Sequence, residues 1–192
     1  MMTSRLRIVF FGTPDFAEAS LRALAASDHE VVGVVTAPDR KAGRGQQLQP
    51  CRVKEAALEL GLPIAQPDKL RAPEFLDQLK AWHADLFAVV AFRMLPEVVW
   101  SMPPKGTVNV HGSLLPDFRG AAPIQLAIAA GVERTGVTSF FITRDIDTGG
   151  LLLQRSTPVT PQDTAGSVYG RLMKEGAGLM LSLIHISEPT RL

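Results

Sequence analysis

The sequence predicts an α/β fold built on a doubly wound, mostly parallel sheet, with antiparallel strands late in the chain. Three observations predict this class. Short apolar runs typical of strands alternate with amphipathic segments typical of helices over residues 1–110. The strand-like runs carry almost no polar alternation, as expected where helices cover both faces of a sheet. Near the end, two strand-like runs are separated by one short loop, which favours antiparallel pairing.

Length and composition are those of one good-sized globular domain. The chain has 192 residues, 46% of them hydrophobic and 20% charged, with a net charge of +1. A molecule so nearly neutral is not a general polycation, so any contact with nucleic acid must come from a local patch. The single cysteine, Cys51, excludes an internal disulfide framework. Because no apolar run near the start resembles a signal peptide, we expect a cytoplasmic protein.

The first strand and helix show the alternation clearly. Residues 6–11 form an apolar run that Gly12 closes, and Thr13 is placed to cap a helix with Pro14 and Asp15 in its first turn. A second apolar run over 30–36 completes a strand–helix–strand unit, whose right-handed crossover makes the two strands parallel.

The elements that follow continue the same pattern as far as the last helix. Apolar runs predict strands, the 3.6-residue period predicts helices, and glycine or proline marks the turns between them. Asp163 or Thr164 begins the last helix. We expect a loop at 37–50, helices at 52–60, 74–82, 96–100 and 121–130, and strands at 62–65, 85–92, 107–111, 136–143 and 151–157.

The expected loop at 37–50 and the start of the next helix carry a local excess of positive charge. Between residues 39 and 54 five cations face one carboxylate, which gives a local charge of +4. One interpretation assigns no function to these charges and treats the segment as a solvated surface loop. The functional interpretation is a mobile basic arm that contacts phosphates, since arginine suits bidentate phosphate binding. The five cations are Arg40, Lys41, Arg44, Arg52 and Lys54, and the carboxylate is Asp39.

Several common sites are excluded by spacing. The glycines at 43 and 45 do not follow the first strand, so they are no dinucleotide fingerprint. No cysteine or histidine cluster has metal-ligand spacing, so we expect no metal. Ser113 does not lie on a nucleophile elbow, which argues against a serine hydrolase.

The strand at 107–111 carries the best candidates for chemistry. Asn109 and His111 are two residues apart, so both side chains leave the same face, about 6.6 Å apart along the strand. The carboxyl end of a strand in an open α/β sheet is where ligands bind. The alternative is a purely structural role, in which the asparagine and the histidine at the strand end form hydrogen bonds within the protein.

Asp147 is the third candidate, in a polar, glycine-ended loop over 144–150. An amide, an imidazole and a carboxylate together suit a reaction in which a carbonyl oxygen gains negative charge while a proton moves. Donors from Asn109 and His111 would stabilise that oxygen, and Asp147 would favour the charged imidazole or accept a proton. The alternative for Asp147 is an ordinary Asx-turn residue.

Four segments carry a family resemblance that runs from Arg5 to Met180. They are NVHGSLLPDFRGAAPIQ at 109–125, IDTGG at 146–150, FFGTPDFA at 10–17 and APDRKAGRGQQLQP at 37–50. Together they resemble the folate-dependent formyltransferase family, and within it the branch that acts on methionyl-tRNA. The resemblance implies a Rossmann-like catalytic domain. It implies transfer of a formyl group from 10-formyltetrahydrofolate to the amino group of methionyl initiator tRNA in translation initiation, without a metal.

The resemblance also implies roles for individual residues. Asn109, His111 and Asp147 match the family's catalytic residues. The family's tetrahydrofolate-binding turn and its loop for the acceptor end of tRNA also have counterparts. The turn matches Ser113, Leu114, Leu115 and Pro116, and the loop matches Arg40, Lys41 and Arg44.

The domain organisation follows from the same resemblance. We expect a formyltransferase catalytic domain over 1–180. The family has a smaller carboxyl-terminal β-barrel domain that helps to hold tRNA, and we expect this domain to be absent here. Residues 181–192 include SLIHISEPTRL, which resembles translated sequencing-adapter sequence, so we expect a foreign tail there. Loss of the second domain predicts weak or absent activity of this chain.

Two other functions stay open at this point. The first is a relative that formylates a small molecule, such as a glycinamide ribonucleotide or an amino sugar; the basic residues at 40–45 argue against it. The second is a fragment that binds folate without turnover.

Overall fold

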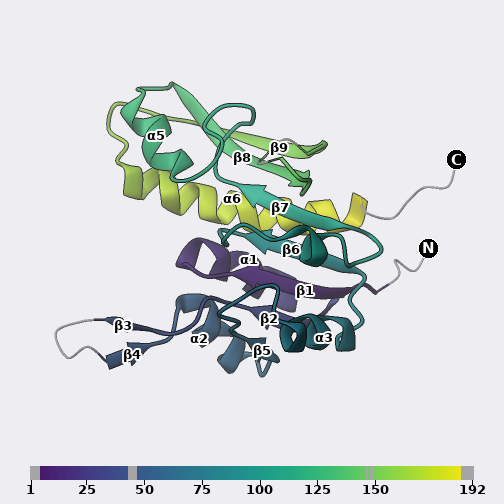
Figure 1. Ribbon diagram of the computed structural model, residues 1–192. Coiled ribbons are helices and arrows are strands. Elements are labelled where there is room, and N and C mark those ends of the chain that lie inside the picture. Colours follow the sequence, from purple (N-terminus) through teal and green to yellow (C-terminus); the bar gives the residue numbers. More distant parts are fainter. Residues whose placement is uncertain (1–4, 43–46, 146, 148, 187–192) are drawn as a thin grey trace, which may run out of the picture. The chain divides into compact units, whose positions relative to one another are not determined.

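The computed structural model describes residues 5–42, 47–145, 147 and 149–186 (Figure 1). The chain forms two compact units, Met1–Thr107 and Val108–Leu192. Within the described part of the chain, no helix is both long and apolar enough to cross a membrane.

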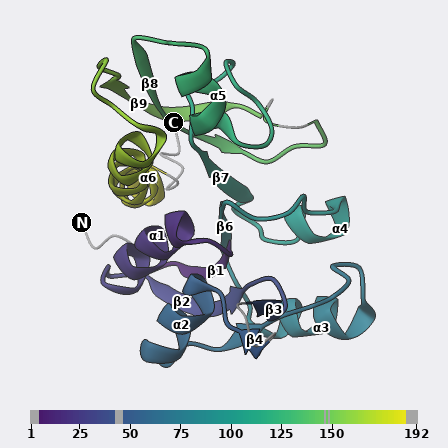
Figure 2. The ribbon, with the colours of Figure 1, turned by 90° about the vertical axis from the view of Figure 1, so that its left-hand side faces the viewer.

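The first unit is a parallel sheet with the strand order β5-β2-β1-β6. The crossover from β1 through α1 to β2 runs outward along this sheet, and the chain returns through α3 to β6 on the other side of β1. Right-handed crossovers in opposite directions place their helices on opposite faces. Figure 2 shows α1 and α3 on either side of these strands, so the sheet is doubly wound as predicted.

The elements of the first unit lie close to their expected positions. Buried side chains occupy nearly every position of β1, β2 and β6, as predicted for strands covered on both faces. The strands of the sheet are β1 (Arg7–Gly12), β2 (Glu30–Val35), β5 (Ile64–Ala65) and β6 (Leu86–Val90), and the helices are α1 (Asp15–Ala25), α2 (Arg52–Glu59), α3 (Pro73–Ala81) and α4 (Glu97–Trp100).

Two local expectations in the first unit are wrong. Thr13 does not cap α1: Pro14 occupies the N-cap position without a side-chain cap, and Asp15 accepts a hydrogen bond from the Phe16 amide instead (2.9 Å). The expected loop at 37–50 contains a two-stranded antiparallel hairpin. The four residues of this ribbon whose burial is described, at 40–41 and 48–49, are all exposed, so no apolar alternation reveals the hairpin in the sequence. Its strands are β3 (Arg40–Ala42) and β4 (Gln47–Gln49).

The second unit holds three antiparallel strands in the order β7-β8-β9, and β7 begins at the boundary residue Thr107. The predicted pairing of the two late strands is confirmed. Helix α6 packs on β8 and β9 and also contacts α5. The elements are β7 (Thr107–His111), α5 (Pro123–Ala129), β8 (Arg134–Phe141), β9 (Leu151–Pro158) and α6 (Ala165–Ile186).

Helix α6 begins where the sequence predicts. Thr164 Oγ1 accepts a hydrogen bond from the Ser167 amide (3.2 Å), and Ser167 Oγ accepts one from the Thr164 amide (3.0 Å). This reciprocal pair satisfies two amides that the helix leaves without an internal partner. The helix continues through Ile186, with Leu183 and Ile184 buried. The expected boundary after residue 180 therefore lies inside a helix, and the foreign origin of 181–192 stays a prediction.

Candidate functional site

Asn109 and His111 lie at the end of β7, as the sequence predicts. They alternate with Val108 and Val110, which are buried at 0% and 2% exposure, so the two polar side chains share the opposite face. Asn109 is half-buried, and its carboxamide forms no hydrogen bond with any residue in the described ranges. Its amide protons are available to a ligand.

Both ring nitrogens of His111 have neighbours within the second unit. Nε2 lies 2.8 Å from the carbonyl oxygen of Phe118. Because a carbonyl only accepts, Nε2 carries a proton and donates it. Nδ1 lies 3.8 Å from Oδ2 of Asp147, which is too long for a hydrogen bond. Nδ1 is therefore the nitrogen left for a substrate.

Asp147 lies beside His111, with a distance of 3.8 Å between Oδ2 and Nδ1. Its Oδ2 also accepts a hydrogen bond from the Gly120 amide (2.8 Å). The carboxylate therefore bonds to a distant segment, whereas an Asx turn would bond within its own loop. The side chains of His111 and Asp147 are only 9% and 12% exposed, so water screens their interaction weakly.

Left-handed residues shape the segment that contacts His111 and Asp147. Phe118, Gly120 and Ala122 have φ values of 54°, 81° and 57°, and Asp147 has a φ of 51°. Non-glycine residues seldom adopt this region. The alternation turns the backbone of 118–122 so that one carbonyl meets the imidazole and one amide meets the carboxylate.

The expected turn at 113–116 is closed by hydrogen bonds. Ser113 is fully buried and its hydroxyl donates to the Asp117 carbonyl (2.6 Å), while the Asp117 amide donates to the Leu114 carbonyl (3.0 Å). Leu115 is buried and Pro116 is exposed. The hydroxyl of Ser113 is therefore engaged with the backbone.

The expected basic patch is smaller than its sequence charge indicates. Lys54 pairs with Asp39 (Nζ–Oδ2, 2.5 Å), and Arg52 pairs with Glu55 (3.1 Å). Arg40 and Lys41 on β3 are exposed and have no ion-pair partner among the described residues. Arg44 lies outside the described residues. Two of the five cations counted in the sequence, Arg52 and Lys54, are therefore paired with carboxylates, and the assignment of Arg40, Lys41 and Arg44 to tRNA stays a prediction.

Asp39 anchors the start of this hairpin. Its Oδ1 accepts a hydrogen bond from Gln66 Nε2 (2.8 Å), which also donates to the carbonyl of Ala37 (2.8 Å). The hydrogen bond from Gln66, and then that from Lys54, lower the pKa of the Asp39 carboxyl below its usual value. Asp39 therefore remains charged at neutral pH.

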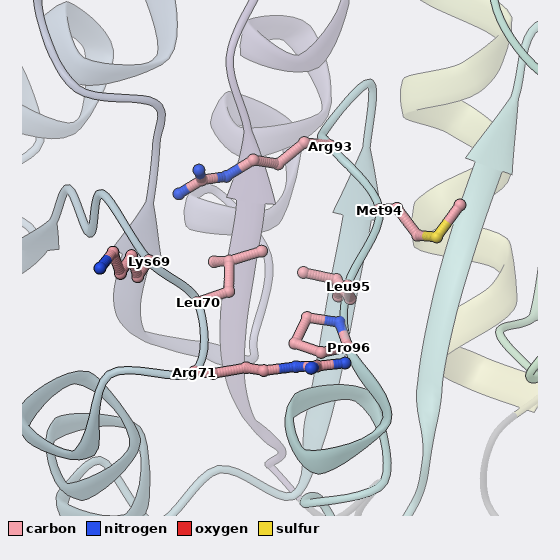
Figure 3. A pocket seen from close by; sticks show the side chains of 7 residues that line it. All are labelled: Lys69, Leu70, Arg71, Arg93, Met94, Leu95 and Pro96. Atoms are coloured by element: carbon pink, nitrogen blue, oxygen red, sulfur yellow. The ribbon is translucent and has the colours of Figure 1, made fainter.

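A pocket of about 470 Å³ in the first unit is lined by residues outside the set of site residues expected from the sequence (Figure 3). Arg93 is held there by hydrogen bonds to the carbonyls of Pro67 and Asp68. Figure 3 shows Leu70 and Leu95 between the three cationic side chains. Such a lining can hold an apolar body with an anionic group. The lining residues are Lys69, Leu70, Arg71, Arg93, Met94, Leu95 and Pro96.

No group of three or more histidine, cysteine, aspartate or glutamate side chains within the described ranges is arranged to hold a metal ion. The polar groups of the site at the end of β7 are an amide, an imidazole and a carboxylate.

The fold and this site define a Rossmann-like α/β domain with a cluster of polar side chains at the end of β7. Residues 6–184 match the family model described as formyl transferase. The chain belongs to that family.

Within this family, the chain is similar to curated methionyl-tRNA formyltransferases. The chain is 52% identical to the methionyl-tRNA formyltransferase of Parabacteroides distasonis over 97% of its own length and 58% of that protein. It is 49% identical to the methionyl-tRNA formyltransferase of Porphyromonas gingivalis, with the same two coverages. The chain therefore spans a little over half the length of these relatives.

Solved structures share the fold. The glycinamide ribonucleotide transformylase 1 of Symbiobacterium toebii superposes with a TM-score of 0.80 at 22% identity, covering 96% of this chain and 88% of that one. The phosphoribosylglycinamide formyltransferase of Bacillus halodurans gives a TM-score of 0.80 at 24% identity and covers 97% of each chain. At these identities the likeness concerns the fold alone.

Proposed function

We propose that this protein transfers a formyl group from 10-formyltetrahydrofolate to the amino group of methionyl initiator tRNA, in the cytoplasm, during translation initiation. One observation carries the proposal: the carboxylate of Asp147 lies 3.8 Å from Nδ1 of His111. It does so in a chain that is 52% identical to a methionyl-tRNA formyltransferase. The sequence pattern also assigns Asn109, His111 and Asp147 to chemistry at a carbonyl carbon.

The reaction begins when the amino nitrogen of methionine attacks the formyl carbon. A carbon–nitrogen bond forms, and the carbonyl electron pair moves to oxygen, which becomes an oxyanion. The carboxamide of Asn109, which has no hydrogen-bond partner among the described residues, donates an N–H to that oxygen. A fixed donor of this kind is typically worth about 3–4 kcal/mol of barrier.

His111 supplies the second donor through Nδ1. Its Nε2–H is already donated to the Phe118 carbonyl at 2.8 Å. When Nδ1 carries a proton it can donate to the reacting oxygen, and the carboxylate of Asp147 lies 3.8 Å away. The hydrogen bond at Nε2 fixes the ring orientation that this step requires.

The remaining steps move one proton and break one bond. The attacking nitrogen is cationic after addition, and it loses a proton to Asp147, directly or through water. The oxyanion then re-forms the carbonyl, the bond from carbon to the folate nitrogen breaks, and that nitrogen takes up a proton. One N–H is lost and one is gained, so the transfer is balanced.

Two further contacts belong to the proposal. Ser113, Leu114, Leu115 and Pro116 form the turn against which the folate binds. Arg40 and Lys41, together with Arg44, contact phosphates at the acceptor end of the tRNA. The exposure of Arg40 and Lys41 supports this assignment, because exposed cations can reach phosphate groups.

The test is a formyl-transfer assay with this protein, 10-formyltetrahydrofolate and charged initiator tRNA. We expect formyl-methionyl-tRNA to form slowly, in keeping with the weak activity predicted above for this chain, and an excess of glycinamide ribonucleotide to compete poorly. Preferential formylation of the small amine would replace the proposed acceptor. Binding of tetrahydrofolate without any transfer would reject the proposed activity for this chain.

A further inference from the structure

The three strands of the second unit carry a row of side chains beside the turn at 113–116. Thr138 on β8 is paired in register with His111 on β7 and with Gln154 on β9. Residues directly opposite each other on antiparallel strands lie on the same face of the sheet. His111, Thr138 and Gln154 therefore form one row across the sheet, on the face that carries the site.

The hydroxyl of Thr138 joins this row to the turn. Oγ1 donates to the carbonyl of Ser113 (2.7 Å) and accepts from the amide of Leu115 (3.0 Å) and from Nε2 of Gln154 (3.0 Å). A hydroxyl has one donor and two acceptor sites, so all of its capacity is used. Thr138 is 0% exposed, and water cannot replace these bonds.

Gln154 completes the connection from the next strand. Its Nε2 also donates to the carbonyl of Leu115 (2.9 Å). Both backbone polar groups of Leu115 are thus bound by side chains of the row. A buried backbone group that loses its partner is costly, so this arrangement determines where the turn lies.

Gly136 lets the turn approach β8 closely. A Cβ atom at Gly136 would lie 2.6 Å from Cδ2 of Leu114 and 2.1 Å from the carbonyl oxygen of Arg155. Gly136 is two residues before Thr138, so the same face of β8 leaves room for the Leu114 side chain and binds the Leu115 backbone. The strand is therefore shaped to receive this turn.

We propose that Thr138 and Gln154 are positioning residues that fix the backbone of 113–116 and, through it, the formyl-donor site beside His111. The proposal rests on the proposed function where it assigns this turn to the folate. Neither side chain is assigned a contact with the substrate. They act through the amide and the carbonyl of Leu115.

The kinetic test compares Thr138→Val, which removes the hydroxyl at nearly constant shape, with Thr138→Ser, which keeps it. We expect Thr138→Val to raise the KM for 10-formyltetrahydrofolate about tenfold, while the KM for charged tRNA stays within about twofold. Thr138→Ser should restore the wild-type KM. An equal rise of both KM values, or no rise for the formyl donor, would overturn the proposal.

Gln154→Leu provides a second variant in case Thr138→Val does not fold. Gln154 is at an exposed position of β9, so its replacement leaves the core intact, and Gln162→Leu is the matched control at another exposed glutamine. We expect Gln154→Leu, and not Gln162→Leu, to raise the KM for the formyl donor by a factor of a few.

Amide hydrogen exchange separates this proposal from the proposed function, because it needs no turnover. Thr138→Val should speed exchange at the Leu115 amide about tenfold, with a native circular dichroism spectrum. Unchanged exchange at 113–116 in both Thr138→Val and Gln154→Leu would refute the positioning role. Absence of formyl transfer by the wild-type chain would instead refute the proposed function.

Discussion

Oδ2 of Asp147 lies 3.8 Å from Nδ1 of His111 and at the same time accepts a hydrogen bond from the Gly120 amide at 2.8 Å. The other nitrogen of His111 donates to the carbonyl of Phe118, two residues before Gly120. The segment at 118–120 is thus bound at one end by the imidazole and at the other by the carboxylate. Ring orientation and carboxylate position are set by one short piece of backbone.

Asp147→Asn tests the charge of the carboxylate separately from its hydrogen bond. The amide oxygen of the variant still accepts from Gly120, so the loop is kept while the negative charge beside His111 is lost. We expect kcat for formyl transfer to fall at least about tenfold. The control is Asp77→Asn at an exposed position. Equal kcat values for Asp147→Asn and wild type would remove Asp147 from the mechanism.

The two glycines after Asp147 differ sharply in the space around them. A Cβ at Gly149 would lie 1.6 Å from the carbonyl oxygen of Phe141, whereas at Gly150 nothing lies within 4 Å. Gly149→Ala should therefore destabilise the protein by about 1–3 kcal/mol, as overpacking does, and displace the loop that carries Asp147. Gly150→Ala should leave stability and transfer unchanged. Thermal unfolding of the two variants gives the comparison, and equal stabilities would contradict it.

Arg40 and Lys41 test the contact with tRNA. Replacing both by alanine removes two exposed cations from β3. We expect a higher KM for charged tRNA and an unchanged KM for 10-formyltetrahydrofolate. The slope of the logarithm of tRNA affinity against the logarithm of salt concentration should become shallower, as expected for the loss of about two phosphate contacts. Lys174→Ala, an exposed cation on α6, serves as control. If the double replacement leaves the affinity for tRNA unchanged, the hairpin does not belong to the tRNA interface.

Asp163 gives a pH-dependent contribution to stability. Its carboxylate accepts hydrogen bonds from Arg171, from the Thr160 amide and from Ser167, and these hold its pKa well below the usual range. An unfolded aspartate titrates near pH 3.9. A depressed pKa in the folded protein adds stability that is present above that pH and is lost as the pH falls below it.

Asp163→Asn should therefore lower the Tm by a few degrees at pH 7. The difference from wild type should stay constant down to about pH 4 and narrow below it. Melting curves at pH 7, 5 and 3 measure this, with Asp28→Asn at an exposed position as the reference. If the Tm difference between Asp163→Asn and wild type widens toward pH 3, the predicted direction of the pH dependence is wrong.

The order of helices and strands was predictable because apolar runs mark the strands and amphipathic segments between them mark the helices. The buried runs that became β1, β2 and β6 are uninterrupted, and the shared face of Asn109 and His111 follows from the two-residue period of a strand. The antiparallel pairing of β8 and β9 follows from the short loop between them. These features depend on neighbours in the sequence.

Features that depend on distant contacts were not predictable from spacing. The approach of Asp147 to His111 requires the left-handed residues at 118 and 120, whose conformations no local pattern indicates. The neutralisation of Lys54 depends on Asp39 being held by Gln66. No apolar periodicity in the sequence indicates the hairpin of β3 and β4, and none indicates the pocket around Arg93.

The most direct test of the central claim is single-turnover formyl transfer by Asn109→Ala and His111→Ala, with saturating 10-formyltetrahydrofolate and charged initiator tRNA. Each replacement should slow the chemical step by about a hundredfold or more, because each removes a donor to the developing oxyanion. Gln162→Ala should leave the rate unchanged. If Asn109→Ala and His111→Ala both fold and transfer the formyl group at the wild-type rate, the mechanism is wrong.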